Sequence, residues 1–115
     1  MVFIGGGLGS ICRYSIAKWL DNYNGAFPMA TFLANVVSCI ILGLFIGYHL
    51  KSGLTANYKL LIITGFCGGF STFSTFSFET LDLMQNGDYT NAFLNIALSL
   101  FVCLLCIFIG VKITS

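Results

Sequence analysis

The sequence predicts an all-α membrane protein with four transmembrane helices, the third of them broken, in a single integral membrane domain covering residues 1–115. Of the 115 residues, 57% are hydrophobic and 8% are charged, whereas a soluble domain carries roughly a quarter charged residues. A helix that crosses a bilayer needs about 20 mostly apolar residues. Four stretches meet this need, at about 1–20, 28–50, 59–83 and 91–112, so we expect the activity to lie in the membrane or at its surface.

The first two spans carry pairs of small residues four positions apart. Gly5 and Gly9 share one face of the first helix, and Gly43 and Gly47 repeat the spacing in the second. Small residues at this spacing let two helix backbones approach closely. We therefore predict tight helix packing along both faces.

Aromatic residues mark the end of the first span. Trp19 and Tyr23 fall at the depth expected for the membrane interface, where such residues are enriched. The following segment, "DNYNGAFP", predicts a turn before the second helix.

The third span contains "GFCGGFSTFSTFSFE", residues 65–79, in which Gly65, Gly68 and Gly69 precede a run of hydroxyl residues. Each glycine weakens a helix by roughly 1 kcal/mol relative to alanine, so a break near Gly68 and Gly69 is predicted. Irregular backbone at membrane depth is tolerated where it is buried in protein or lines a cavity. Freed carbonyls there suit a small cation, and the N-terminus of a half-helix suits an anion.

After the predicted break, Phe73 and Phe76 lie three residues apart, and hydroxyls are interleaved with them at Ser71, Thr72, Ser74 and Thr75. A phenyl edge carries partial positive charge and a hydroxyl donates a hydrogen bond, so both could coordinate an anion weakly. Packing phenylalanines and hydroxyls bonded to their own helix explain the same pattern. From the residues alone, both interpretations stay open.

Polar side chains are few in these spans and need partners there. Asn35 has none in its own span, so it should meet another helix or an aqueous path. Asn91, Asn95, Ser99 and Cys103 recur at four-residue spacing and share one face of the fourth helix. Hydrogen bonding between helices and a polar pathway are both compatible with this stripe.

Arg13 and Glu79 are the two charged residues that lie inside the spans rather than at their ends. Arg13 lies too deep to reach either surface easily, so it must face a water-filled cavity, carbonyls or a carboxylate, unless the first span begins later. Glu79 could line a vestibule or reach lipid headgroups.

Several functions are disfavoured. An odd number of cysteines, all within apolar spans, argues against a disulfide framework. They are Cys12, Cys39, Cys67, Cys103 and Cys106. A net charge of +1 gives no basic stripe for nucleic acid, and no nucleophile, base and orienting group converge as an enzyme would need.

The basic residues set membrane orientation only weakly. With four spans, Lys51, Lys59 and Lys112 share one side with the N-terminus, and Lys18 lies toward the other. This bias is compatible with one fixed orientation and equally with insertion in both.

The stretch "GFCGGFSTFSTFSFE" closely resembles the signature of the bacterial fluoride channel family, known as CrcB or Fluc. The resemblance extends to "GGGLGSICRY" in the first span and the asparagine of "TFLANVV" in the second. It implies a passive fluoride channel in the inner (plasma) membrane that lowers cytoplasmic fluoride. It also implies an antiparallel, dual-topology homodimer with two pores, surrounded by lipid, and one structural sodium ion at its centre.

By match to the family motif, the resemblance implies roles for particular residues. Backbone carbonyls of Gly68 and Ser71 from each subunit would hold the sodium ion. The fluoride pore would be formed by Phe73, Phe76, Asn35, Ser74, Thr75 and Ser99. Arg13 and Glu79 match charged family positions, for which the resemblance implies a vestibule or assembly role.

The sequence departs from the family at two places. Ser71 stands where the family usually has threonine, which should matter little because the implied ligand is a main-chain oxygen. Ser38 and Cys39 stand where many relatives carry glycine and a small residue, a change that we interpret as packing.

A proton-coupled small multidrug exporter is the alternative function, since such proteins share this length, four spans and dual topology. That mechanism needs a carboxylate in the first span, where this chain has Arg13. A membrane assembly subunit without transport activity is a third possibility.

Overall fold

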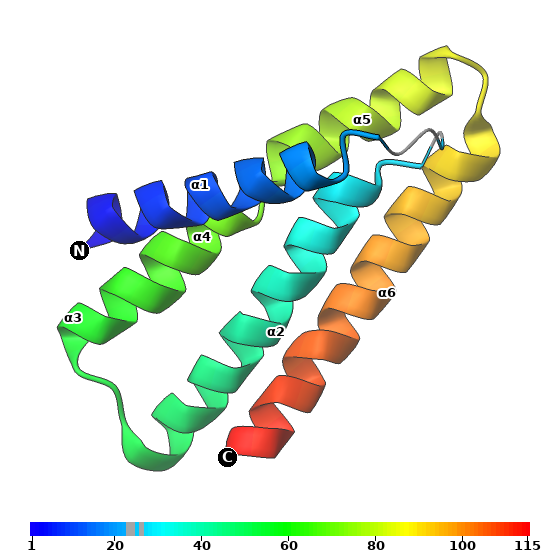
Figure 1. The fold of residues 1–115 in the computed structure, drawn as a ribbon. Helices are drawn as coiled ribbons and strands as arrows, with labels where there is room; N and C mark the ends of the chain where they lie inside the picture. The colour runs from blue at the N-terminus through cyan, green and yellow to red at the C-terminus, as the bar shows by residue number, and fades with distance from the viewer. Residues whose placement is uncertain (23–24, 26) are drawn as a thin grey trace.

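The computed structural model describes residues 1–22, 25 and 27–115, and every regular element in these ranges is helical (Figure 1). The prediction for Tyr23 lies outside the described residues. The elements are α1 (Val2–Trp19), α2 (Met29–Ser52), α3 (Ala56–Tyr58), η1 (Lys59–Cys67), α4 (Gly68–Phe70), α5 (Phe73–Gln85) and α6 (Tyr89–Thr114). Residues in η1 form a π-helix, a wider helix with i to i+5 hydrogen bonds that is rare outside functional regions.

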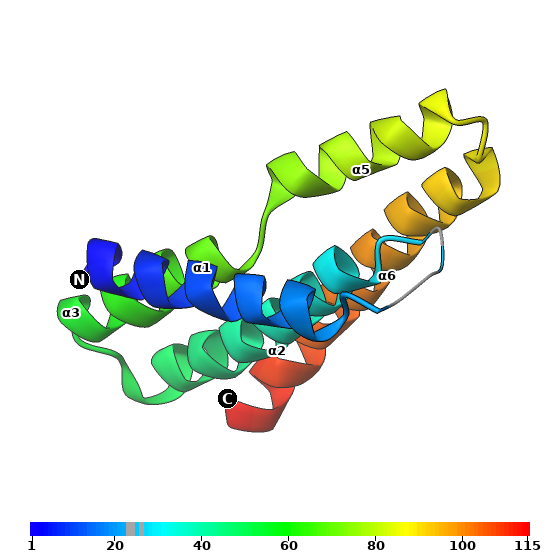
Figure 2. The same cartoon turned by 45° about the horizontal axis from the view of Figure 1, so that its top comes forward.

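The long helical segments alternate in direction along the chain. α1 lies beside the segment α3–η1–α4 and runs the same way, while α2 and α6 lie side by side and both run in the opposite direction (Figure 1). α5 continues beyond α4 after an extended link and stands away from the ends of α1 and α2 (Figure 2). Four alternating segments are the arrangement expected for four membrane crossings.

Helices α2 and α6 approach to backbone contact through glycines. A Cβ atom added to Gly43 would lie 2.9 Å from the Cα of Ile107, and one added to Gly47 would lie 3.0 Å from the Cα of Val111. The two contacts are one helical turn apart on both helices, so the helices keep a constant parallel register. One turn toward the N-termini this register pairs Cys39 with Cys103.

Helix α1 packs on the third span in the same manner. A Cβ at Gly5 would lie 2.9 Å from the Phe66 nitrogen, and one at Gly9 would lie 2.7 Å from the Phe70 nitrogen. Across the interface, a Cβ at Gly69 would lie 3.0 Å from the Cα of Gly6. The predicted tight packing at both glycine pairs is confirmed.

The break in the third span lies downstream of its predicted position. Gly68 is helical, with φ −64° and ψ −36°, and Gly69 lies within α4. The extended residues are Ser71 (φ −87°, ψ 154°) and Thr72 (φ −148°, ψ 124°). The break predicted near Gly68 and Gly69 is thus present but begins just after them, because close packing on α1 uses Gly69 while two hydroxyl residues interrupt the helix.

The burial pattern is that of a membrane protein. Most of the buried residues are small or polar, including Ala34, Ser38, Asn95 and Ser99, whereas many large side chains such as Phe101 are exposed. Exposed apolar surface on this scale faces lipid or a partner rather than water.

Within the described residues, three helical segments are long and apolar enough to cross a membrane: Met29–Ser52, Ala56–Gln85 and Tyr89–Thr114. These support a multi-pass membrane protein. α1 forms the predicted first helix, but Arg13 and Lys18 lower its mean hydropathy, and its 18 residues cover about 27 Å at 1.5 Å per residue. Its crossing of the bilayer stays a prediction.

Candidate functional site

A cavity of about 260 Å³ lies beside the helix break, and we call it the break cavity. It brings together four of the predicted pore residues, Asn35, Phe73, Phe76 and Ser99, from three different helices. Its full lining is Asn35, Cys39, Ser71, Thr72, Phe73, Phe76, Ser99, Leu100, Cys103, Leu104 and Ile107. The cavity thus joins polar donors and phenyl rings inside an otherwise apolar helical protein.

Asn35 connects α2 to the break. Its Oδ1 accepts a hydrogen bond from the Thr72 backbone N–H at 3.0 Å. In a continuous α-helix that N–H would donate to the carbonyl of Gly68. Asn35 therefore stabilises the break, and with its oxygen engaged, the amide presents its two N–H donors for other partners.

The phenyl rings of Phe73 and Phe76 lie with their centroids 5.8 Å apart and their planes tilted by 39°. Phe76 is partly buried, while Phe73 is 78% exposed. Both rings line the break cavity, but Phe73 also leaves a large apolar surface uncovered in the single chain.

Hydroxyl groups close the N-terminus of α5. The Thr72 Oγ1 accepts from the Thr75 backbone N–H at 3.3 Å, as an N-cap residue does. It also lies 3.2 Å from the Ser74 Oγ and 3.4 Å from the Thr75 Oγ1. Ser74 is exposed and is not part of the cavity lining, and Thr75 lines a different cavity. The structure does not gather these two with the other predicted pore residues.

A buried chain of hydrogen bonds joins α5 to α6. Ser99 Oγ donates to Asn95 Oδ1 at 3.3 Å, and Asn95 Nδ2 donates to Thr80 Oγ1 at 2.8 Å. Thr80 Oγ1 in turn donates to the Phe76 carbonyl at 2.8 Å. Asn95 and Ser99 of the polar stripe on α6 thus belong to an interhelical network, and Ser99 also reaches the break cavity. Sequence reasoning missed Thr80, although it follows Phe76 by one helical turn.

Ser38 and Ser71 anchor the end of the first half of the third span. The Cys67 carbonyl accepts from Ser71 Oγ at 2.9 Å and from Ser38 Oγ at 3.2 Å. It accepts from the Ser71 backbone N–H as well, at 3.1 Å. Ser38, which sequence reasoning treated as packing, in fact binds across the two spans, and a hydroxyl in an apolar span was the available signal.

The carbonyls of Gly68 and Ser71 meet some requirements of a cation site. Gly68 is exposed, a Cβ there would have no atom within 4 Å, and its usual helical donor, the Thr72 N–H, is bound to Asn35. The Ser71 ψ of 154° turns its carbonyl out of the helical direction. Unwound carbonyls at helix breaks are suited to sodium, so these residues fit the predicted ligand, but one chain supplies only part of a coordination shell.

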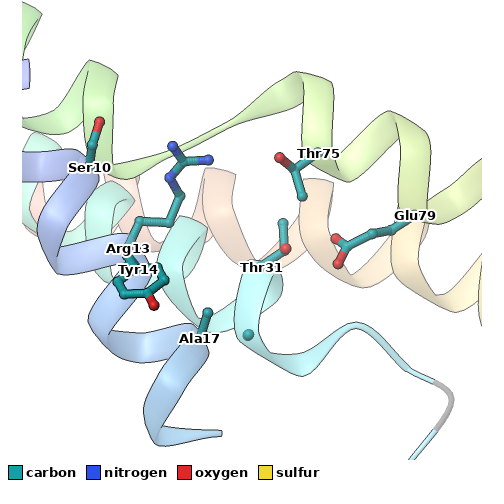
Figure 3. A pocket seen from close by; sticks show the side chains of 8 residues that line it. Ser10, Arg13, Tyr14, Ala17, Thr31, Thr75 and Glu79 are labelled. Atoms are coloured by element: carbon teal, nitrogen blue, oxygen red, sulfur yellow. The ribbon is translucent and has the colours of Figure 1, made fainter. Parts of the chain in front are cut away.

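A second cavity of about 340 Å³ lies between α1, α2 and α5 (Figure 3), and we call it the charged cavity. Arg13 and Glu79 both line it, with Thr31 and Thr75 between them in the view. The Arg13 Nε and the Glu79 Oε1 are buried and have no hydrogen-bond partner within the described residues. Arg13 thus faces a cavity, one of the alternatives that its depth required.

The sequence profile of the family described as CrcB-like protein, Camphor Resistance (CrcB), matches residues 1–111. The chain belongs to the CrcB family. A relative from Flavobacterium psychrophilum, named fluoride-specific ion channel FluC, is 42% identical over 99% of this chain and 94% of its own length. A relative of the same name from Pyrococcus abyssi is 41% identical over 96% of this chain and 89% of its own length. A third relative of this name, from Campylobacter lari, is 42% identical over 95% of this chain and 90% of its own length.

This membership confirms the resemblance seen in the sequence. The named relatives of this CrcB protein are ion channels rather than enzymes, in agreement with the prediction that the chain has no catalytic activity. Membership also agrees with the multi-pass membrane architecture indicated by the apolar helices.

Proposed function

We propose that this protein is a fluoride-specific channel, which conducts the ion passively out of the cell and lowers its cytoplasmic concentration. One observation carries the proposal: the break cavity gathers the Asn35 amide, the Phe73 and Phe76 rings and the Ser99 hydroxyl. Because the chain belongs to the CrcB family and its relatives are named fluoride-specific ion channels, we infer that these groups bind fluoride.

The chemistry of the cavity suits a small anion. Asn35 uses its oxygen to hold the break, so its N–H donors remain for the ion. The break also creates the N-terminus of α5, where backbone N–H groups and the helix dipole favour negative charge. Phenyl edges add weak electrostatic attraction. Several weak contacts in succession let an ion both bind and leave, as conduction requires.

We propose further that two antiparallel copies of the chain form the channel, with two pores. Phe73 is 78% exposed in the single chain, and a Cβ at Gly68 would have no atom within 4 Å. A second copy could therefore cover the Phe73 ring and contact the exposed backbone at Gly68. A symmetric dimer presents the same surface twice. The weak charge bias of the loops permits insertion in both orientations.

In that dimer, the carbonyls of Gly68 and Ser71 from both copies would hold a structural sodium ion. Two chains double the oxygen ligands that one chain offers. When bound, the ion would supply positive charge that keeps the facing carbonyls together at the dimer centre.

Flux from proteoliposomes tests the function. Purified protein is reconstituted into vesicles loaded with potassium fluoride, and efflux is followed with a fluoride electrode after valinomycin is added to dissipate the voltage. We expect rapid, protein-dependent fluoride efflux and little chloride efflux from matched vesicles. Equal rates for the two halides, or fluoride loss no faster than from protein-free vesicles, would refute the proposal.

A further inference from the structure

Two cysteines meet in the break cavity. Cys39 of α2 and Cys103 of α6 both line it, and the two thiols are neighbours. Their pairing follows from the parallel register of these helices, which brings Gly43 against Ile107 one turn further along. Backbone contact at that next turn keeps the two cysteines from separating.

The other three cysteines do not line this cavity. Cys67 is buried, with 3% of its surface exposed, and it is not part of the lining. Neither Cys12 nor Cys106 lines the cavity, and all five cysteines are free thiols. Cys39 and Cys103 are therefore the pair that an ion in the break cavity would meet.

We propose that Cys39 and Cys103 form a binding site for one soft monovalent metal ion, Cu(I) or Ag(I). Thiolate sulfur is the ligand that such ions prefer, and they are commonly held by two sulfurs in a line. A structural zinc site needs four ligands, and the described residues hold no cluster of three or more His, Cys, Asp or Glu side chains.

Binding releases two protons and transfers no electrons. Each thiol loses its proton to water as its sulfur forms a bond to the metal, because the thiolate is the metal ligand. The product carries one negative charge, from two thiolates and one monovalent cation. Affinity for the metal should therefore rise with pH.

The bound ion would obstruct the cavity. Asn35 and Ser99 lie one helical turn from the cysteine pair on the same helices, and all four residues line the same space. A negatively charged complex there repels an entering anion as well as filling the cavity. This block of conduction rests on the proposed function, whereas metal binding itself does not.

Binding is tested with silver nitrate in chloride-free buffer on the full-length protein in detergent. Three variants are compared, all in a Cys12→Ser, Cys106→Ser background that retains Cys67: the background itself, the background with Cys39→Ser, and the background with Cys103→Ser. Native mass spectrometry counts the bound silver. We expect tight binding of a single ion to the background and its loss from both variants that lack one cysteine of the pair.

The unmutated protein supplies a second measurement that does not depend on the variants folding. A maleimide reagent labels accessible thiols with and without silver, and peptide masses identify the labelled sites. Silver should protect Cys39 and Cys103 together, at lower concentration than it protects Cys12. Silver retained by both variants that lack one cysteine of the pair, or protection of Cys39 and Cys103 at different silver concentrations, would overturn the site.

Fluoride efflux separates the two proposals. Silver should stop efflux through the background protein but not through correctly folded variants lacking either cysteine of the pair. Protein that binds silver yet conducts no fluoride before its addition would refute the proposed function and leave the metal site standing. Unchanged efflux from silver-loaded background protein would refute the block.

Discussion

Asn35 performs two tasks with one amide. Its oxygen holds the Thr72 N–H at the break, and its nitrogen is left to donate into the cavity. The two tasks can be separated by changing one end of the side chain, since a carboxylate keeps the acceptor and removes the donors.

Asn35→Asp should therefore preserve the fold and greatly slow fluoride flux. A hydrogen bond to a charged group contributes about 1.5–3 kcal/mol, so its loss slows conduction by roughly 10- to 100-fold, and carboxylate charge adds repulsion. Fluoride-electrode traces check the rate, and size-exclusion chromatography checks folding. Asn35→Asp protein that is folded and as fast as the parent would contradict the role of the amide.

Phe76 supplies a ring edge that an aliphatic side chain lacks. Phe76→Ile should slow fluoride efflux by roughly two- to tenfold, given about 0.5–1.5 kcal/mol for an aromatic contact. Phe78 is the matched control, because it lies on the same helix, is 68% exposed and does not line the break cavity. Similar losses for Phe76→Ile and Phe78→Ile would show that the ring at Phe76 has no special part in conduction.

At the scale of helices, glycine contacts fix where the break lies. α1 presses on the third span at Gly5 and Gly9, and the half-helix η1–α4 follows α1 until Phe70. Beyond that point Asn35 captures the Thr72 N–H, and Thr72 begins α5 as its N-cap. Packing on one side and hydrogen bonds on the other thus determine the site's geometry.

Gly9→Val should loosen this contact. Its Cβ would collide with backbone atoms of Phe66 and Phe70, and overpacking of this kind costs about 1–3 kcal/mol. We expect a lower thermal midpoint in detergent and slower fluoride efflux. Gly7→Val is the matched control, since a Cβ at Gly7 meets no atom within 4 Å. Equal midpoints for the two variants would contradict the importance of the contact.

The sequence predicted these helices well and the break less well. The hydropathy of a span and the four-residue spacing of its glycines can both be read from residues close together in the sequence. The helices and their packing faces were therefore predictable. The break was placed slightly too early because helix propensity penalises Gly68 and Gly69 irrespective of a neighbour, whereas contact with α1 keeps Gly69 helical. A hydroxyl in an apolar span indicates that Ser38 needs a partner, but no local pattern identifies that partner as the Cys67 carbonyl, 29 residues away.

At the scale of the whole molecule, the single chain leaves an apolar ring, a glycine backbone and two buried polar atoms without partners within the described residues. Phe73 is largely exposed, and Gly68 has open space where a Cβ would be. In the charged cavity, Arg13 and Glu79 keep buried atoms without hydrogen bonds in the part of the chain described. A second copy and water would satisfy these groups.

Gly68→Leu tests the proposed assembly. A Cβ at Gly68 has no atom of the described residues within 4 Å, so the monomer fold should persist. A leucine side chain there should force apart carbonyls that converge on sodium in a dimer. Chemical cross-linking in detergent, with and without sodium, should show fewer dimers and no response to sodium. Gly7→Leu, also in open space, should behave as the parent does. A fully dimeric, sodium-responsive Gly68→Leu protein would exclude a central site at this residue.

The constant register of α2 and α6 also gives the break cavity a direction. Near Asn35 and Ser99 the two helices leave room for polar side chains, and by Gly43 and Ile107 their backbones touch. The lining extends from Asn35 and Ser99 as far as Ile107, where the two backbones meet. In the proposed pore, backbone contact closes that end of the cavity, so we expect the ion to leave past the rings of Phe73 and Phe76 on α5 instead.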